Sequence, residues 1–196
     1  LDLTSLTCVD DYTIEGNNLD EDAQYDLLVQ LTCLSEDSLV VFSAGDADDF
    51  CAKGDTEVED LYVNATGSDD VDLSCIASVT GYLEIENSDA PSIDLSGLTD
   101  VADELSIHDN GNLTDIDLSS LTAVGSYLYL YANNDLVSVD LSALETIDGS
   151  VTIQDHDDLE TVSLDALTSI GDSLTLYEND LLLDFEAPLL DEIGGS

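Results

Sequence analysis

The chain of 196 residues lacks arginine and has a single lysine, Lys53, against 46 acidic residues, so its formal charge is -45. Nucleic acids and anionic membranes are bound largely through Lys and Arg, and the sequence therefore excludes both as partners. No apolar run approaches the roughly 20 residues that a membrane-spanning helix requires. Methionine and tryptophan are absent, and only two prolines are present. Proteins, glycans and cations remain as candidate partners.

A chain with this charge imbalance is often disordered, but 43% of its residues are hydrophobic, which is enough to form a core. The apolar residues recur at a fixed interval in the C-terminal half, and the interval shortens to 22 residues toward the N-terminus. Fixed periods of 20–50 residues are typical of solenoids. The clearest series keeps a step of 23 residues through Leu98, Leu121, Leu144, Leu167 and Leu190.

Each repeat contains two triplets in which apolar residues flank an outward residue. One triplet is Leu128–Leu130 and the other is Val139–Leu141. This alternation is typical of strands with one buried face. We expect a mainly β chain, a parallel β-solenoid of about eight coils of 22–23 residues, with two short parallel sheets on different faces.

The whole chain, residues 1–196, is expected to form one repeat domain. Residues 1–50 are the predicted N-terminal capping region, and residues 19–31 have the apolar stripe and acidic first turn of a covering helix. Residues 51–196 are the predicted regular coils. The sequence stops within a repeat, so an open or truncated C-terminal end is expected, with strand edges that could assemble with another copy.

The repeat resembles the receptor L domain family, a right-handed β-solenoid relative of leucine-rich repeats. Residues 167–179 read L-T-S-I-G-D-S-L-T-L-Y-E-N and are similar to a common repeat of that family, L-x-S-I-G-x-S-L-x-I-x-x-N. Cys8, the helix at 19–31 and Cys33 are similar to the opening cap of that family, in which the corresponding cysteines form a disulfide. The resemblance covers nearly the whole chain and implies a fold more than a function.

Four cysteines in an acidic chain favour disulfides and an extracellular or cell-surface location, with four buried thiols as the alternative. Cys8 and Cys33 lie in the same local sequence about one coil apart, and stacked coils bring such positions within disulfide reach. Cys51 and Cys75 are also about one coil apart. The expected pairs are Cys8–Cys33 and Cys51–Cys75.

Aspartate occupies the outward position of the second triplet in consecutive repeats. Neighbouring copies in a parallel stack are about 4.8 Å apart, and facing like charges on strands repel one another. Carboxylates suit Ca²⁺, so one interpretation is a row of divalent-cation sites; the other is a solvated acidic face that tolerates high salt. No cofactor is expected beyond Ca²⁺ or other cations. The row consists of Asp72, Asp94, Asp117 and Asp140.

Exposed tyrosines form the predicted contact surface. Tyr127, Tyr129 and Tyr131 alternate with inward leucines, and Tyr177 lies near the same face two coils later. Exposed Tyr favours binding, although Tyr also simply suits strands. Asn64 and Asn112 begin N-glycosylation sequons.

Asparagines recur at the bend after the first triplet and are expected to form a structural ladder that satisfies backbone groups. His156 shares their register, and His108 is expected at the surface. The expected ladder consists of Asn17, Asn87, Asn110, Asn133 and Asn179.

No motif supports catalysis, since repeat-periodic acids lack the enclosed environment of catalytic carboxylates. We therefore expect a non-enzymatic extracellular or cell-surface module that binds or adheres to a protein or glycan through one solenoid face. The alternative is a structural subunit of an extracellular filament, sheath or surface layer that assembles end to end. A weaker hypothesis is ice binding through outward Thr152 and Thr175. The excess of acids over Lys and Arg resembles halophilic adaptation.

Overall fold

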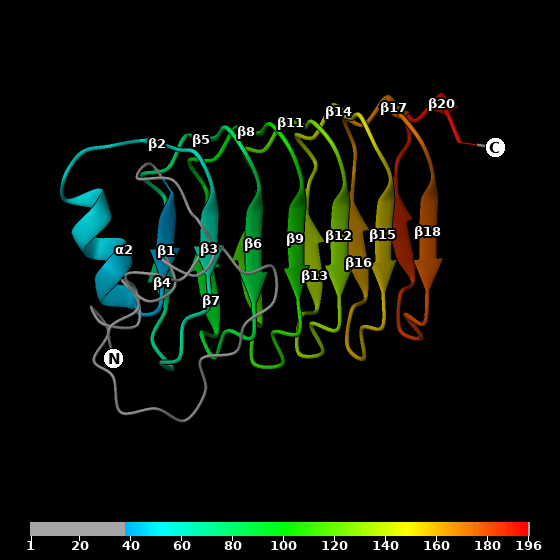
Figure 1. Cartoon of the computed structure of the whole chain (residues 1–196). Coiled ribbons are helices and arrows are strands. Elements are labelled where there is room, and N and C mark those ends of the chain that lie inside the picture. Colours follow the sequence, from blue (N-terminus) through cyan, green and yellow to red (C-terminus); the bar gives the residue numbers. More distant parts are fainter. Residues whose placement is uncertain (1–37, 196) are drawn as a thin grey trace, which may run out of the picture.

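The computed structural model describes residues 38–195, and these residues wind into a parallel β-solenoid (Figure 1). Strands that are 21 to 23 residues apart in sequence lie side by side and pair in parallel, so each coil stacks on the one before it. About seven such coils are described. The remaining predicted coil elements, and the predicted helix at 19–31, lie outside the described residues.

The largest face of the solenoid is a seven-stranded parallel sheet, called sheet 1 here. Its apolar-x-apolar sequence turns alternate side chains inward, and most of these inward residues are fully buried. The strands correspond to the first predicted triplet. They are β1 (Leu39–Val41), β3 (Leu61–Val63), β6 (Leu83–Glu86), β9 (Leu105–His108), β12 (Leu128–Tyr131), β15 (Val151–Gln154) and β18 (Leu174–Tyr177).

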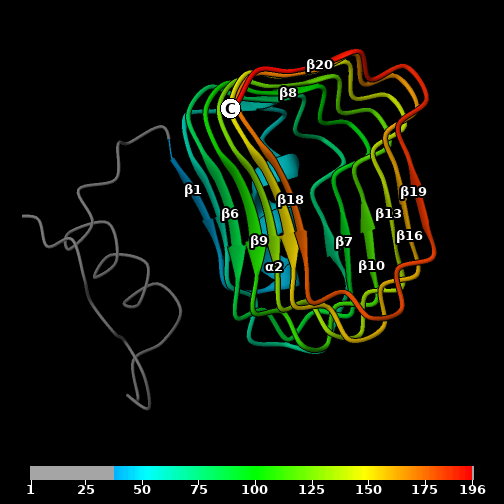
Figure 2. The same cartoon turned by 90° about the vertical axis from the view of Figure 1, so that its right-hand side faces the viewer.

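The second triplet forms the opposite wall of the coil, which is divided into two three-stranded sheets (Figure 2). Sheet 3 contains β4 (Val71–Asp72), β7 (Ser92–Asp94) and β10 (Asp115–Asp117). Sheet 4 contains β13 (Ser138–Asp140), β16 (Thr161–Ser163) and β19 (Asp184–Glu186). The two walls agree with the two predicted strand faces.

A further seven-stranded sheet, sheet 2, connects the two walls and was not expected from the sequence (Figure 2). Each strand has only two residues and ends at a repeating Val or Ile, and all of these side chains except Ile193 of β20 are buried in the core. Alternation cannot be read in two residues, so periodicity alone does not indicate these strands. They are β2 (Glu57–Val58), β5 (Ser78–Val79), β8 (Asp100–Val101), β11 (Ala123–Val124), β14 (Thr146–Ile147), β17 (Ser169–Ile170) and β20 (Glu192–Ile193).

The core is a continuous column of aliphatic side chains inside the coil. Leu98, Leu121, Leu144 and Leu167 each have 0% exposed surface, as their 23-residue spacing implies. Between coils the backbones approach closely where sheet 2 passes into sheet 1. A Cβ atom at Gly125 would collide with the backbone carbonyl of Ala102 in the preceding coil, so this bend requires glycine.

The described N-terminal end of the core is covered by one helix, α2 (Ala44–Cys51), which packs against β1 and β4 (Figure 1). Ser43 begins the helix, and its backbone N–H donates to the Asp46 carboxylate at 2.8 Å. The buried face is small, with Ala47 at 0% exposure. The covering helix predicted at 19–31 lies outside the described residues, and α2 overlaps the end of the predicted capping region, which extends to residue 50. Within the described residues, no helix is long and apolar enough to cross a membrane.

Candidate functional site

The outer face of sheet 1 brings together the side chains with the strongest binding chemistry in the described chain. Strand pairing aligns them in rows across the coils. Tyr129 lies between Ser106 and Thr152, and Tyr131 lies between His108 and Gln154. The face is therefore a regular array in which each outward position has a defined neighbour above and below.

Tyrosines occupy the middle of this face, as predicted. The rings of Tyr129 and Tyr131 are stacked, with centroids 5.9 Å apart and planes at 19°. Tyr127 lies immediately before β12 and is 49% exposed. Tyr177 is 59% exposed and shares the row of Tyr131, with Gln154 between them, so it belongs to the face itself. The structure thus places all four predicted tyrosines on or beside one face.

Acidic groups raise the pKa of two of these tyrosines. The charge of Asp155 raises the pKa of Tyr131 above its usual value. The Tyr177 pKa is also raised, first by a hydrogen bond to Glu178. A neutral tyrosine ring is an amphipathic contact group, with an apolar body and a polar hydroxyl.

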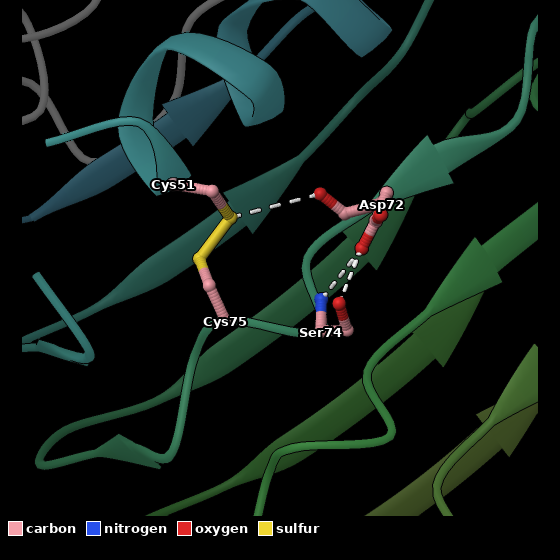
Figure 3. The surroundings of a disulfide bond; sticks show 4 residues. All are labelled: Cys51, Asp72, Ser74 and Cys75. Atoms are coloured by element: carbon pink, nitrogen blue, oxygen red, sulfur yellow. Dashed lines mark hydrogen bonds between the residues drawn. A yellow bond between two sulfur atoms is a disulfide. The ribbon is translucent and has the colours of Figure 1, made fainter. Parts of the chain in front are cut away.

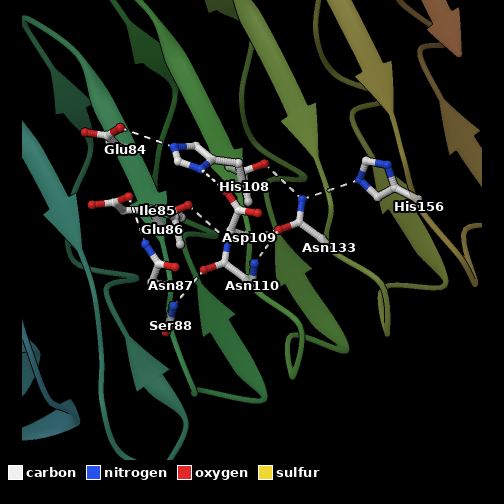
Figure 4. Close-up of polar contacts among 11 residues, drawn as sticks. Glu84, Ile85, Glu86, Asn87, Ser88, His108, Asp109, Asn110, Asn133 and His156 are labelled. Carbon is white, nitrogen blue, oxygen red and sulfur yellow. Dashed lines mark hydrogen bonds and ion pairs between the residues drawn. The ribbon is translucent and has the colours of Figure 1, made fainter. Parts of the chain in front are cut away.

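Next to the tyrosines lies a cluster that we call the His108 cluster, formed by Glu84, Glu86, His108 and Asp109 (Figure 4). Pairing of β6 with β9 places Glu86 directly beside His108, and Glu84 lies two residues before Glu86 on the same face. His108 Nε2 lies 3.3 Å from Glu84 Oε1, and Nδ1 lies 3.0 Å from Asp109 Oδ2. The Tyr129 ring centroid is 6.3 Å from that of His108.

The carboxylates around His108 alter the titration of the whole cluster. The hydrogen bond to Glu84 raises the pKa of His108 to about 9, which leaves the imidazole protonated at neutral pH. Burial first, and then the charge of Glu84, raise the pKa of Glu86. The same two causes raise the pKa of Glu104. Perturbed groups that gather at one place are a mark of functional sites.

The sequence contained a signal for this cluster that the expectation of a surface histidine did not use. His108 follows Glu86 by 22 residues, which is the repeat length in this part of the chain. The two side chains therefore had to lie on adjacent coils in the same row.

The predicted aspartate row has outward side chains but is divided between two sheets. Asp94 pairs with Asp72 and Asp117 in sheet 3, whereas Asp140 pairs with Ser163 in sheet 4. Among the described residues, His108 Nε2 or Nδ1 and the Glu84 and Glu86 oxygens form the group of three metal-ligating atoms within 4.8 Å of one another. The aspartate row does not form such a group, and its cation binding stays a prediction.

Each aspartate of this row also has a local role. Its Oδ1 accepts a hydrogen bond from the backbone N–H of the serine two residues later, which closes the turn after the strand. Hydrogen bonds from Ser74 and Ser119 lower the pKa of Asp72 and Asp117, respectively. The Asp–Leu–Ser repeat thus has a structural reason independent of any cation. The distances are 3.0 Å for Asp72–Ser74, 2.8 Å for Asp94–Ser96, 3.0 Å for Asp117–Ser119 and 2.9 Å for Asp140–Ser142.

A buried polar ladder crosses the coils at the bend where the strands of sheet 1 end (Figure 4). Asn133 Nδ2 donates to the Ile107 carbonyl at 2.9 Å, and Asn133 Oδ1 accepts from Asn110 Nδ2 at 2.9 Å. His156 is the next member of the ladder. It is 1% exposed, and this burial lowers its pKa. Among the described residues, every buried side-chain nitrogen and oxygen has a hydrogen-bond partner.

One expected ladder member is displaced by one position. Asn87 has a left-handed backbone, with φ of 48°, in the row of Asp109 and Asp155. Ser88 takes the ladder position instead, and its backbone N–H donates to Asn110 Oδ1 at 2.9 Å. The register changes because the coil from β6 to β9 has 22 residues, not 23. Asn17 lies outside the described residues.

The Cys51–Cys75 disulfide is present and joins the end of α2 to the loop after β4 (Figure 3). Its Cα atoms are 5.7 Å apart. Cys51 Sγ also lies 3.9 Å from the backbone oxygen of Asp72. The disulfide therefore fastens the covering helix to the first coils. Cys8 and Cys33 lie outside the described residues.

The two sequons differ in accessibility. Asn112 is exposed in the loop between β9 and β10, and its Nδ2 donates to Asp89 Oδ1 at 3.1 Å. Asn64 is half-buried directly after β3. Glycosylation of either residue stays a prediction, with Asn112 the more accessible.

The last described coil leaves core positions open. Leu176 is 41% exposed and Ile193 is 44% exposed, whereas their equivalents one coil earlier, Ile153 and Ile170, are fully buried. Leu183 and Leu189 are also exposed, at 84% and 59%, but they take the outward positions of Glu160 and Ala166 one coil earlier. No described residue covers Leu176 and Ile193 on the outer side of this coil.

Comparisons with known proteins give no further constraint. No family model, curated protein or solved structure matches the chain. The resemblance to receptor L domains therefore stays a prediction that rests on the repeat pattern alone.

Proposed function

We propose that this chain is a non-catalytic extracellular or cell-surface module that binds or adheres to a protein or glycan partner through the outer face of sheet 1. The observation that carries the proposal is the stacked pair of Tyr129 and Tyr131 between exposed Tyr127 and Tyr177. Aromatic rings of this kind supply large contact area at low entropic cost and dominate binding energies.

The geometry of the face supports this proposal. Parallel pairing over seven coils makes the sheet rigid, and the buried ladder satisfies the backbone groups where the strands end. A rigid surface loses little entropy when a partner binds. The proposal further includes a right-handed receptor-L-like solenoid of about eight coils, whose remaining coil lies before residue 38.

The location and the charge are part of the same proposal. The Cys51–Cys75 disulfide is compatible with an oxidising extracellular setting. The 46 acidic residues suit a salty or Ca²⁺-rich medium, in which counter-ions screen their repulsion. Partners rich in phosphate are disfavoured because the chain has one Lys and no Arg.

The proposal is tested with defined probes. The full chain is screened in 1 M KCl against a glycan array and against peptide arrays of stated net charge, and the best probe is measured by calorimetry. The double variant Tyr129→Ala, Tyr131→Ala is expected to weaken binding at least tenfold, since hot-spot tyrosines contribute about 2 kcal/mol or more. Val137→Ala, an exposed apolar residue directly before β13 on the opposite wall, is the control and should change affinity less than twofold. Equal affinity of the double variant and the wild type would refute the proposal.

A second candidate function is structural, as a subunit of an extracellular filament, sheath or surface layer. It is favoured by the exposed core positions Leu176 and Ile193 of the last described coil. Free strand edges above an exposed core can accept a further coil or a second copy of the chain. Light scattering and electron microscopy at high salt, with and without chelator, test it. We expect assemblies that grow with protein concentration and that Leu176→Lys abolishes; monomers at every concentration would contradict this candidate function.

A further inference from the structure

The geometry points to a binding site for one divalent first-row transition-metal ion, such as Zn²⁺ or Co²⁺, held by Glu84, Glu86 and His108. This inference does not depend on the proposed binding function. It differs from the predicted Ca²⁺ row, which lies in sheets 3 and 4 on the opposite wall of the coil.

The three ligands come from two neighbouring strands whose pairing fixes their spacing. Glu86 and His108 are directly paired, and Glu84 precedes Glu86 by two residues on the same face. One ligand atom from each side chain lies within 4.8 Å of the others, and all three residues are half-buried. Two β-strands in register therefore place a nitrogen and two carboxylate oxygens around a common point (Figure 4). Solvent can complete the coordination from outside the sheet.

The ligand types select the class of metal. Ca²⁺ and Mg²⁺ prefer all-oxygen coordination, with six or more ligands for Ca²⁺. An imidazole nitrogen together with carboxylates suits Zn²⁺ and other first-row transition ions. A site with three protein ligands also matches the open coordination that these metals accept.

Neighbouring groups hold the ligands in orientation. Asp109 Oδ2 lies 3.0 Å from His108 Nδ1, so Nδ1–H donates to this carboxylate and Nε2 faces Glu84. Without a metal Nε2–H donates to Glu84, and an ion that binds Nε2 displaces this proton to solvent. A carboxylate behind the free nitrogen of a metal-binding histidine is the usual arrangement, because it fixes the ring and increases its basicity. Asn87 Nδ2 donates to Glu86 Oε2 at 3.0 Å and steadies the second carboxylate.

The charge around the site favours a cation. Glu104 faces the cluster from the position before β9, and Tyr129 and Tyr131 face it from β12. The whole chain has a single Lys and no Arg, so its other positive side chains offer little competition for these carboxylates. A divalent ion in contact with Glu84 and Glu86 would neutralise two half-buried charges at once.

The test uses the full chain stripped with EDTA, in 1 M KCl and 5 mM CaCl₂ to saturate diffuse acidic sites. Zn²⁺ titration by calorimetry should show one site whose affinity is higher than that of the diffuse acidic sites. His108→Gln should weaken it at least tenfold, and Asp109→Asn should weaken it by roughly tenfold or more. Glu160→Gln, an exposed acid on another face, is the matched control and should leave it unchanged.

A measurement on the wild type makes the test independent of variant folding. The chain has two histidines, and addition of Co²⁺ should shift the NMR signals of the His108 ring far more than those of buried His156. Ca²⁺ at the same concentration should not shift them. Equal Zn²⁺ affinity in folded His108→Gln and the wild type, or a His108 signal unmoved by Co²⁺, would overturn the inference.

Discussion

The two histidines should give this protein opposite stability changes on the two sides of pH 6.5, and His108 provides the sharper test. Its folded pKa of about 9 exceeds the ordinary value of 6.5, because Glu84 accepts a hydrogen bond from its ring. Protonated His108 therefore stabilises the fold fully below pH 6.5. This contribution is lost as the pH rises through 9, where the folded state gives up the extra proton.

The size of the stability change follows from the shift in the His108 pKa and from the exposure of its carboxylate partners. A rise from 6.5 to about 9 corresponds to about 3 kcal/mol at roughly 1.4 kcal/mol per pKa unit. The Glu84 side chain is 34% exposed and Asp109 is 47% exposed, so solvent and salt screen part of this energy. We expect the free energy of unfolding to fall by about 1–2 kcal/mol between pH 6.5 and 9.5.

Urea unfolding at a series of pH values, with EDTA present, measures this change. His108→Gln should remove the pH-dependent part while keeping a polar side chain beside Glu84. NMR titration of the two rings gives their pKa values directly, and the variant assigns them. A His108 pKa near 6.5, or the same pH dependence in the wild type and His108→Gln, would refute the reasoning.

His156 is the internal control because its shift has the opposite sign. Burial lowers its folded pKa below 6.5, so its stabilising contribution is present above pH 6.5 and is lost as the pH falls below that value. His156→Asn extends the asparagine ladder and should remove the acid-side loss while leaving the alkaline loss intact. Loss of the alkaline limb in this variant would show that His108 is not its source.

Three further predictions concern stability. Asn133→Ala removes the side-chain partner of a buried carbonyl and of a buried amide. At about 1–3 kcal/mol for each unsatisfied group, it should lower the free energy of unfolding by about 4 kcal/mol in a urea titration. Asn112→Ala at the surface should lower it by less than about 0.5 kcal/mol in the same titration. Replacing Cys51 and Cys75 by serine opens a loop of 24 residues and should lower the free energy of unfolding by about 3 kcal/mol, and reduction of the wild type should have a similar effect. The melting temperature should rise between 0.1 and 2 M KCl because salt screens the 46 acids; a constant melting temperature in salt and in millimolar Ca²⁺ would contradict the predicted adaptation.

Much of the fold followed from the repeat. Leu98, Leu121 and their partners at 23-residue steps are buried, as a stacked coil requires. Both predicted strand faces exist, and so does the pairing of Cys51 with Cys75, because equivalent positions on adjacent coils lie close together. These features depend only on period and alternation, which the chain repeats often enough to be unambiguous.

Sequence reasoning missed the elements that occur once or are too short to show a pattern. Helix α2 occurs once, has eight residues and buries mainly Ala47, so it carries no apolar stripe of the kind seen at 19–31. The two-residue strands of sheet 2 are too short to show alternation. Asn87 lies outside the ladder because the coil from β6 to β9 has 22 residues, so a 23-residue step counted back from Asn110 misses the ladder position by one.

The sequence by itself determined the length of the coil, which side chains face inward, and a formal charge of -45. Its 22-residue step also places Glu86 and His108 in one row. Only the tertiary structure decided which outward side chains make contact, because the alignment of neighbouring coils and the side-chain orientations depend on the folded stack. His108 shows the difference most clearly. Stacking brings it to Glu84 and Glu86 on the preceding strand, and this contact turns an ordinary surface histidine into a cation with a pKa of about 9.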